Sequence, residues 1–325
     1  MIASIRMVAL ITLEVLGYLD AIELASFMET SRAAYLFANH VDLWRDVTLR
    51  RWSSHLVFVS TWRDTYARAA FAAAGRLHDI QTFQPHVPIR VANFFSDMLH
   101  RTWACHTCEW ESSCPGFFVH NDVPRRDAAD LSADAFVAEY EMANRPVIIR
   151  GAVGEWDAMR LWTPEYLAAT CGDRQFRATS ATAPVAAQFT MAEYFAYASQ
   201  AREEAAMYLF DRDFHAVAGL GGDYTIPTYF RPGPPRRAVS ATSRNDGSQD
   251  PPGDGRGYAT DLFRVFGETA RPDYRWLIAG PRRSGSIFHI DPNMTNAWNV
   301  CVKGRKKWIF YPPSVCPPGV ERCVF

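Results

Sequence analysis

The sequence predicts an α+β protein with a helical N-terminal part and a strand-rich C-terminal part. Apolar residues recur at helical spacing through residues 8–52, and from residue 121 onward short apolar runs alternate with capped helical segments. The strand-rich part leads to residues 286–313, SIFHIDPNMTNAWNVCVKGRKKWIFYPP, where charged and polar residues are set into apolar runs. This segment holds the candidate site.

Composition permits a substantial core and room for two domains, because 48% of the 325 residues are hydrophobic and 14% are aromatic. A formal net charge of −1 gives no bulk electrostatic reason to bind nucleic acid or an acidic membrane, although the basic run 303–307 leaves local contacts open. The apolar stretch 7–13 is interrupted by Glu14 and Asp20 too early for a secretory core or a membrane span. Seven irregularly spaced cysteines favour a reducing compartment. We therefore expect the nucleus or the cytoplasm, without secretion.

Residues 8–52 predict several short helices joined by tight turns. The apolar positions that repeat at helical spacing are Val15, Leu16, Leu19, Leu24, Phe27, Met28, Leu43, Trp44 and Val47. The stretch resembles an F-box in its early Glu-Val-Leu, its Tyr-Leu followed by a small helix, and its closing Leu-Trp-Arg. That resemblance implies the adaptor Skp1 of cullin-type ubiquitin ligases as a partner. The alternative is a small helical bundle that only packs against the next domain.

Residues 53–120 are expected to form a helical extension followed by a linker, in which Pro85 and Pro88 break any helix. The linker contains Cys105, Cys108 and Cys114 near three histidines, which makes zinc a candidate ligand. The Cys-x-x-Cys has no matching second pair, so buried structural thiols are the alternative reading.

From residue 121 the pattern alternates helices and strands. LSADAFVAEY predicts a helix capped by Ser132, and WTPEYLAATCGD predicts a helix that begins at Thr163 and Pro164 and ends at Gly172. RPVIIRG is expected to be a short buried strand, and QFRATSA, MAEYFAYASQA and AAMYLFD read as strand, helix and strand. Residues 231–257 concentrate Pro, Gly, Ser and charge, which predicts a disordered insertion.

His289 and Asp291 stand two residues apart in an apolar run. In a strand their side chains project to the same face, while Ile290 turns away. One imidazole and one carboxylate supply two thirds of the facial triad that holds non-haem Fe(II). The spacing also arises by chance, and a strand histidine can equally be a hydrogen-bonded core residue.

The residues around His289 and Asp291 strengthen the hypothesis that the pair binds iron. We expect a strand and a Gly-Pro-Arg-Arg-Ser-Gly turn before it, and Pro292 to end the strand that bears it. A strand at 296–302 would place Asn299 and Cys301 on one face. A strand at 306–311 would place Lys306 beside two aromatic rings. A lysine inside a barrel needs an anion, and the carboxylate of a cosubstrate would supply one.

This C-terminal region resembles the Jumonji-C oxygenases, in particular their arginine- and lysine-modifying branch, once called the phosphatidylserine receptor. The stretches that carry the resemblance are LSADAFVAEYEMANRPVIIRGAVGEW, WTPEYL, MYLFD, IPTYF, DLF and RPDYRWLIAGPRRSGSIFHIDP. The resemblance covers about residues 121–320 and implies a double-stranded β-helix of the cupin or jelly-roll type. The predicted domains are thus an F-box-like helical domain at 8–52, the extension and linker at 53–120, and a Jumonji-C-like domain at 121–325.

By that resemblance His289 and Asp291 are the catalytic residues that bind Fe(II). Lys306 would pair with the distal carboxylate of 2-oxoglutarate, and Asn299 would line the cosubstrate pocket. Ser286 would hydrogen-bond the same carboxylate where the family more often has threonine, a conservative change because both offer a hydroxyl. The substrate implied is a lysine, or an N-methylated arginine or lysine, of another protein.

The second histidine of the triad is the feature that does not fit, because His289 is the last of nine histidines. Cys316 and Cys323 are poor replacements at an oxygen-activating ferrous centre. A jelly roll needs about eight strands, and only the first core strands can be placed. We therefore expect an N-terminal part of the domain, from a truncated gene model or an incomplete reading frame, with a short isoform or a degenerate binding domain as alternatives.

Three functions follow from the sequence. The first is an Fe(II)- and 2-oxoglutarate-dependent protein hydroxylase or demethylase. We expect the 325-residue chain to be inactive, because the second histidine ligand of the iron is missing. The second is a noncatalytic F-box substrate adaptor of a ubiquitin ligase. The third, a structural cupin-like domain with a coincidental His-x-Asp, is disfavoured by the joint presence of Ser286, Asn299 and Lys306.

Overall fold

The structure is a computed structural model that describes residues 2–87, 89–107, 122–183, 185–217, 219–230 and 266–318. The predicted insertion at 231–257 lies outside the described residues, as do Cys108, Cys114 and Cys323.

The N-terminal part consists of helices, as predicted. They are α1 (Ile2–Leu16), α2 (Ala21–Met28), α3 (Arg32–Ala38), α4 (Val41–Arg51), α5 (Trp62–Ala73), α6 (Leu77–Gln81) and α7 (Asp97–Thr107). Side-chain caps set the helix starts: Asp20 accepts from two amides of α2 and forms a capping box with Glu23, and Ser31 and Thr61 cap α3 and α5. Among the helices that the structure describes, none is long and apolar enough to cross a membrane.

The C-terminal part mixes short helices and strands. Its strands are β1 (Arg125–Asp127), β2 (Ile148–Arg150), β3 (Phe176–Thr179), β4 (Ala187–Phe189), β5 (Tyr208–Asp211) and β6 (Leu277–Ala279). Its α-helices are α10 (Ala133–Phe136), α11 (Asp157–Leu161), α12 (Pro164–Cys171), α13 (Met191–Gln200) and α14 (Gly267–Ala270). One π-helical turn, η2 (Val137–Glu141), continues α10, and 3₁₀ turns lie at η1 (Ala128–Asp130), η3 (Phe214–Ala216), η4 (Thr228–Phe230) and η6 (Pro292–Met294).

The helix boundaries agree with the caps read from the sequence. Ser132 caps α10, and α12 begins after the Thr163 cap with Pro164 at its first position and ends at Gly172, whose φ is +53°. The strand expected in RPVIIRG is present as β2, but the prediction that it is buried is wrong. It pairs only with β1, in parallel, and Ile148 is exposed, because a two-stranded ribbon has too few neighbours to cover both faces.

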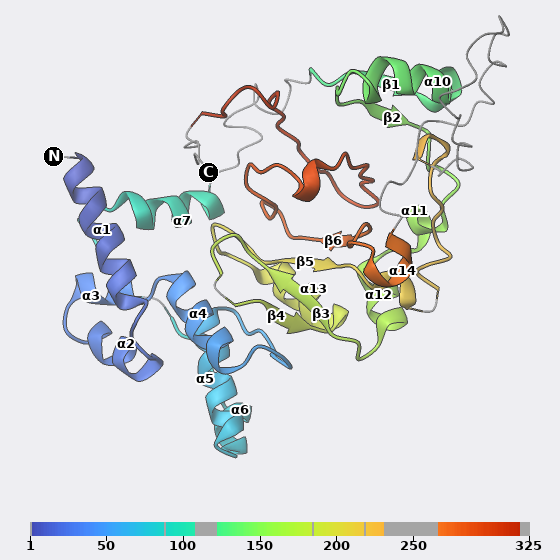
Figure 1. Ribbon diagram of the computed structural model, residues 1–325. Helices are drawn as coiled ribbons and strands as arrows, with labels where there is room; N and C mark the ends of the chain where they lie inside the picture. The colour runs from blue at the N-terminus through green and yellow to red at the C-terminus, as the bar shows by residue number, and fades with distance from the viewer. Residues whose placement is uncertain are drawn as a thin grey trace, which may run out of the picture.

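The main sheet is antiparallel throughout, in the order β4-β3-β5-β6. Helix α13 lies across one face of this sheet (Figure 1), and its buried Tyr194 and Tyr197 pack against Phe189 of β4. The backbone N–H of Gln188 in β4 donates to the carbonyl of Ser53 at 2.6 Å. The outer edge of the sheet is therefore met by the loop that follows α4, which reduces its exposure as a pairing edge.

One hydrophobic core runs from the helices into the sheet. Leu24, Trp44 and Trp62 from the N-terminal helices belong to the same buried cluster as Phe176 and Leu209 of the sheet. A second, smaller cluster joins Leu131, Phe136, Tyr140 and Tyr229 beside β1 and β2. The helical part and the four-stranded sheet thus share their main core.

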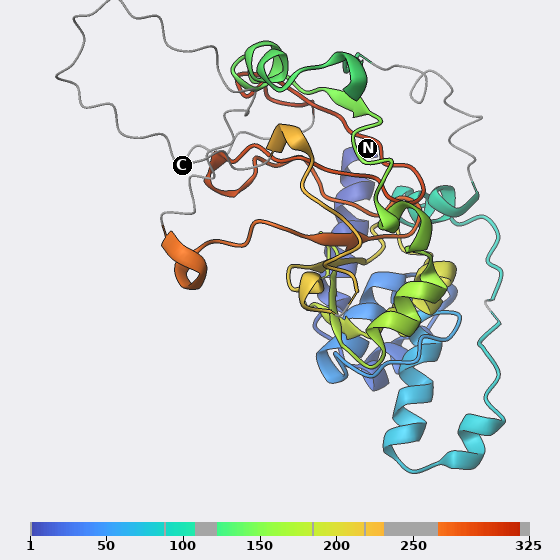
Figure 2. The ribbon, with the colours of Figure 1, turned by 90° about the vertical axis from the view of Figure 1, so that its right-hand side faces the viewer.

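The segment after β6 runs between the β1–β2–α10 unit and the main sheet, as Figures 1 and 2 show in orange to red. The strands expected around the His289 and Asp291 pair, at 296–302 and at 306–311 are not formed, so that prediction is wrong for these residues. The only regular element from residue 280 to residue 318 is η6. A strand requires a ladder partner for its backbone groups, and within the described residues no neighbouring strand pairs with this segment.

Candidate functional site

The two predicted metal donors lie side by side. His289 Nε2 is 3.1 Å from Asp291 Oδ1, and His289 Nδ1 is 2.7 Å from the carbonyl oxygen of Ile287. Because a carbonyl only accepts, Nδ1 carries a proton in this geometry, and Nε2 is the nitrogen directed at the carboxylate. The two side chains are 50% and 41% exposed, so solutes can reach them. The shared face that the His-x-Asp spacing predicted is present, although the backbone is not a strand.

The pair fits two adjacent positions of a metal ion. Neighbouring ligands of an octahedral ion with bonds of about 2.1–2.2 Å lie roughly 3.0–3.1 Å apart, which is the separation of Nε2 and Oδ1. One imidazole and one carboxylate are also the donor types that ferrous iron takes. Among the residues that the structure describes, no three His, Cys, Asp or Glu side chains come close enough together to hold a metal. These residues therefore supply two protein ligands.

A turn on each side fixes the backbone of the pair. Before it, Ser284 donates its backbone N–H and its hydroxyl to the carbonyl of Pro281, at 3.1 and 2.8 Å. Gly280 allows this turn to close, since a Cβ there would stand 2.0 Å from Ser284 Oγ. After the pair, Pro292 opens η6 and the amide of Met294 donates to the carbonyl of Asp291 at 3.0 Å. The predicted turn before the pair is present, whereas Pro292 opens η6 and does not end a strand.

Ser286 lies against a residue that sequence analysis did not assign to the site. Its hydroxyl is 3.2 Å from the hydroxyl of Tyr208, the first residue of β5. The available signal was the alternation in MYLFD, which places Tyr208 and Phe210 on one face of the strand, with ring centroids 6.1 Å apart. Alternation alone did not say that this face turns toward Ser286, which is distant in sequence.

Asn299 occupies an exposed position in an extended segment that its neighbours anchor. Trp298 stacks on Phe230, with ring centroids 5.5 Å apart and an interplanar angle of 3°, and Val300 and Val302 pack against the main core. Asn299 and Cys301, between these anchoring residues, are exposed. The alternation predicted for residues 296–302 is therefore retained at 298–302, and the place of Asn299 in a cosubstrate pocket stays a prediction.

Lys306 lies over an aromatic ring. Its Nζ is 4.3 Å from the ring centroid of Trp308, and Trp308 stacks on Phe310 at 5.4 Å, so the three side chains share a face as predicted. Desolvation lowers the pKa of Lys306 below its ordinary value, and the Cys301 thiol opposes that shift. Among the described residues no carboxylate pairs with this ammonium. A cation without a carboxylate partner is the kind of group that an anionic cosubstrate would neutralise.

The cysteines proposed for zinc are not tested by the structure. Cys108 and Cys114 lie outside the described residues, and of Cys105 only the backbone in α7 is described. Zinc at these cysteines stays a sequence prediction.

Comparison with known proteins gives the family. The family model described as "Cupin-like domain" matches residues 132–318, which include every residue of the candidate site. The arginine-specific demethylase JMJ22 of Arabidopsis thaliana is 34% identical over 317 residues, covering 96% of this chain and 53% of that protein. The lysine-specific demethylase JMJ21 of the same plant is 30% identical over 312 residues, covering 94% of this chain and 28% of that protein.

A third relative matches a smaller share of the chain. The bifunctional arginine demethylase and lysyl-hydroxylase psr-1 of Caenorhabditis briggsae is 29% identical over 199 residues, covering 60% of this chain and 43% of that protein. The chain thus spans about half the length of JMJ22 and less of the other two. The family match covers more than half of the chain, and the relatives are demethylases and a hydroxylase. The chain therefore belongs to the cupin-like domain family, in its Jumonji-C group.

Proposed function

We propose that this chain supplies iron- and cosubstrate-binding residues of an Fe(II)- and 2-oxoglutarate-dependent oxygenase that hydroxylates or demethylates protein side chains. The observation that supports the proposal most strongly is the adjacency of His289 Nε2 and Asp291 Oδ1 at 3.1 Å, on a segment bounded by two turns. The names of the relatives, which include arginine and lysine demethylases and a lysyl-hydroxylase, support the reaction type.

Each residue of the site has a role in this proposal. His289 and Asp291 hold two positions of the metal, and the bond from Nδ1 to the Ile287 carbonyl orients the imidazole. Lys306 neutralises the distal carboxylate of 2-oxoglutarate, while the hydroxyls of Ser286 and Tyr208 donate to it. When bound, iron with 2-oxoglutarate supplies an oxidation that is coupled to decarboxylation of the cosubstrate to succinate.

The proposed substrate is a lysine, or an N-methylated arginine or lysine, presented by another protein. The exposure of His289 and Asp291 supports a side chain from a separate molecule as the substrate. The relatives divide between arginine and lysine in their names, so the proposal covers both residue types.

Two protein ligands bind iron weakly, and we therefore predict little succinate release from the 325-residue chain alone. Imidazole added to the Fe(II)-loaded chain can occupy a further position and should raise succinate release with a saturable dependence. His289→Ala should abolish that gain, and His215→Ala, which removes a histidine of η3, should retain it. Robust turnover without imidazole would refute the predicted inactivity, and no turnover at any imidazole concentration would argue against the oxygenase.

A noncatalytic F-box adaptor is the second candidate, and a surface of α1 and α2 favours it. Apolar side chains at alternating spacings of three and four residues lie between 56% and 81% exposed. These side chains, called here the α1–α2 stripe, are Val8, Ile11, Val15, Tyr18 and Ile22. Glu14 of α1 and Glu23 of α2 are exposed charged residues on the same two helices. Exposed apolar side chains repeated along α1 and the start of α2 are typical of a protein interface.

The adaptor proposal is tested by capture of a Skp1-like protein on the full chain, since the helices share their core with the sheet. Ile11→Asp combined with Val15→Asp should abolish capture. Val87→Asp combined with Phe95→Asp introduces the same two charges at side chains that are also exposed but lie outside the stripe, and should leave capture intact. Failure of the unaltered chain to capture Skp1 would remove the adaptor function.

A further inference from the structure

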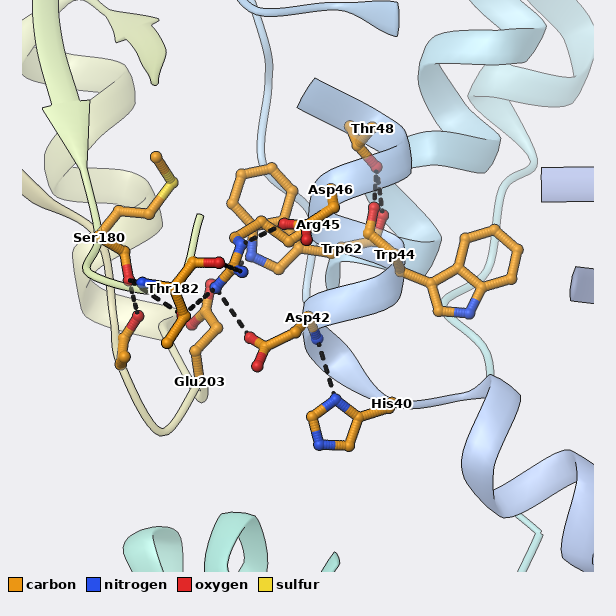
Figure 3. A network of polar contacts seen from close by, with 12 residues as sticks. His40, Asp42, Trp44, Arg45, Asp46, Thr48, Trp62, Ser180, Thr182 and Glu203 are labelled. Carbon is orange, nitrogen blue, oxygen red and sulfur yellow. Dashed lines mark hydrogen bonds and ion pairs between the residues drawn. The ribbon is translucent and has the colours of Figure 1, made fainter. Parts of the chain in front are cut away.

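A buried arginine joins the N-terminal helices to the loop after β3. Arg45 of α4 is fully buried, and its guanidinium contacts Asp42 Oδ1 at 2.8 Å and Asp46 Oδ1 at 2.9 Å. The same group donates to the carbonyl oxygen of Thr182 at 3.2 Å and lies 3.3 Å from its hydroxyl. Figure 3 shows Arg45 extending from α4 to this loop, with Thr182 and Ser180 facing it. Ser180 in turn donates to the carbonyl of Ala205 at 2.7 Å, which lies just before β5.

A buried carboxylate makes a second link to the same region. Glu203 accepts hydrogen bonds from the indole N–H of Trp62 in α5 and, at 3.0 Å, from the hydroxyl of Tyr197. The Tyr197 hydroxyl also accepts the backbone N–H of Met207 at 2.9 Å. Burial raises the pKa of Tyr197 well above its ordinary value, so the hydroxyl keeps the proton that it donates to Glu203. A chain of hydrogen bonds thus runs from helix α5 to the residue that precedes β5.

The two links, called here the polar seam, end at the strand that contacts the candidate site. Met207 is followed by Tyr208, whose hydroxyl lies 3.2 Å from that of Ser286. The buried Tyr194, also of α13, donates to the carbonyl of Ala279 in β6 at 2.7 Å and lies 3.2 Å from that of Met207. The first residue of β5 is therefore held from the helices through buried groups that have little freedom to rearrange.

A fully buried guanidinium and a nearly fully buried carboxylate are costly to desolvate and need every partner in place. Each group has a partner across the boundary between the helices and the sheet. Arg45 of α4 donates to the Thr182 carbonyl in the loop after β3, and Glu203, which precedes β5, accepts from Trp62 of α5. Ordinary packing between two separable modules would not require charged groups at such positions, because an interface between independent domains is more solvated. The match to JMJ22 covers 96% of the chain, so the alignment takes in most of the helical part together with the sheet.

We propose that the N-terminal helices are a fixed buttress of the cupin-like sheet, and that Trp62 and Glu203 are positioning residues that hold Tyr208 opposite Ser286. The structural part of this proposal, that the helices support the sheet, depends only on the hydrogen bonds and ion pairs of the polar seam. The effect of this support on cosubstrate binding rests on the proposed function, because the hydroxyls of Tyr208 and Ser286 bind 2-oxoglutarate only if the chain has that function. The proposal also places any partner bound on the α1–α2 stripe in one orientation relative to the site.

Amide hydrogen exchange of residues 204–209 in the full chain tests the buttress. Trp62→Phe keeps an aromatic ring and removes the donor to Glu203, and it should speed exchange in this segment about ten- to a hundredfold. Glu203→Ala should give a similar increase, and Glu203→Gln should give a smaller one because its amide oxygen can still accept. The matched control is Trp162→Phe, which loses a bond of the same kind to Asp223 at 2.8 Å, away from the seam. That variant should leave exchange at 204–209 unchanged.

Affinity of the Mn(II)-loaded chain for 2-oxoglutarate tests the positioning. Trp62→Phe should weaken binding, while Ser286→Ala should weaken it without faster exchange at 204–209. Unchanged amide exchange at residues 204–209 in Trp62→Phe and Glu203→Ala would overturn the proposal that the helices support the sheet. An equal rise in exchange in Trp162→Phe would overturn it as well. If exchange responds as expected and the unaltered chain binds no 2-oxoglutarate, the buttress is supported while the proposed function and the positioning role fail.

Discussion

Replacement of Arg45 by methionine should destabilise the fold more than replacement of any exposed arginine. Methionine has a similar length and would fill much of the space, but Asp42, Asp46 and the Thr182 carbonyl would lose the guanidinium between them. Removing one partner from a buried ion pair costs about 3–5 kcal/mol. Because the two aspartates are 32% and 20% exposed and can recover some hydration, we expect about 2–4 kcal/mol here.

Urea unfolding followed by tryptophan fluorescence measures this loss, with Arg160→Met as the matched control. Arg160 pairs with Asp157 at 2.9 Å, the same distance as the Arg45 to Asp46 pair, but both partners are largely exposed. The control should cost less than about 1 kcal/mol. An Arg45→Met variant no less stable than Arg160→Met would refute the claim that the polar seam joins helices and sheet.

The cost of Arg45→Met should also depend on pH. Burial raises the pKa of Asp46 above its ordinary value of 3.8, and Arg45 opposes that shift. A carboxyl whose pKa is raised on folding contributes its stability below the unfolded value and loses it as the pH rises through the folded value. Without Arg45 the folded pKa rises further, so the penalty should be largest near neutral pH and should shrink as the pH falls toward the unfolded value of about 4. An equal penalty at both ends of that range would contradict this reasoning.

Three further outcomes are expected. Asp20→Ala removes the acceptor of two α2 amides and should cost about 1 kcal/mol in urea unfolding, whereas no loss would show that the capping box is not needed. Gly280→Ala places a Cβ 2.0 Å from Ser284 Oγ and should cost about 1–3 kcal/mol in the same assay, and a neutral result would show that the turn relaxes freely. Lys306→Met should weaken 2-oxoglutarate binding about ten- to a hundredfold by calorimetry, and because the pKa of Lys306 is lowered, binding to the unaltered chain should fade at a less alkaline pH than 10.5. Equal affinity in the variant would remove Lys306 from the site.

Local signals in the sequence predicted much of the fold. The caps at Ser132 and Thr163 and the stop at Gly172 gave helix boundaries, because a side-chain oxygen or a left-handed glycine acts on backbone groups a few residues away. The side-by-side placement of His289 and Asp291 also followed from local geometry, since two extended residues suffice to define a face.

The features that sequence reasoning missed depend on contacts between distant residues. The apolar run around His289 and Asp291 favours a strand, but pairing requires a neighbour that an apolar run does not specify. The Tyr208 to Ser286 contact joins residues 78 apart, and the Trp62 to Glu203 contact joins residues 141 apart. The shared core likewise could not be read from residues 8–52, whose helical periodicity shows that a face is apolar but does not identify what it packs against.

Binding of Mn(II), titrated by electron paramagnetic resonance in the presence of imidazole, tests the central claim most directly. We predict that the unaltered chain binds the ion with one site, and that His289→Gln and Asp291→Asn each weaken binding at least tenfold. His215→Gln should bind like the unaltered chain. Equal binding by all four proteins would show that His289 and Asp291 do not hold a metal and would contradict the assignment of the site.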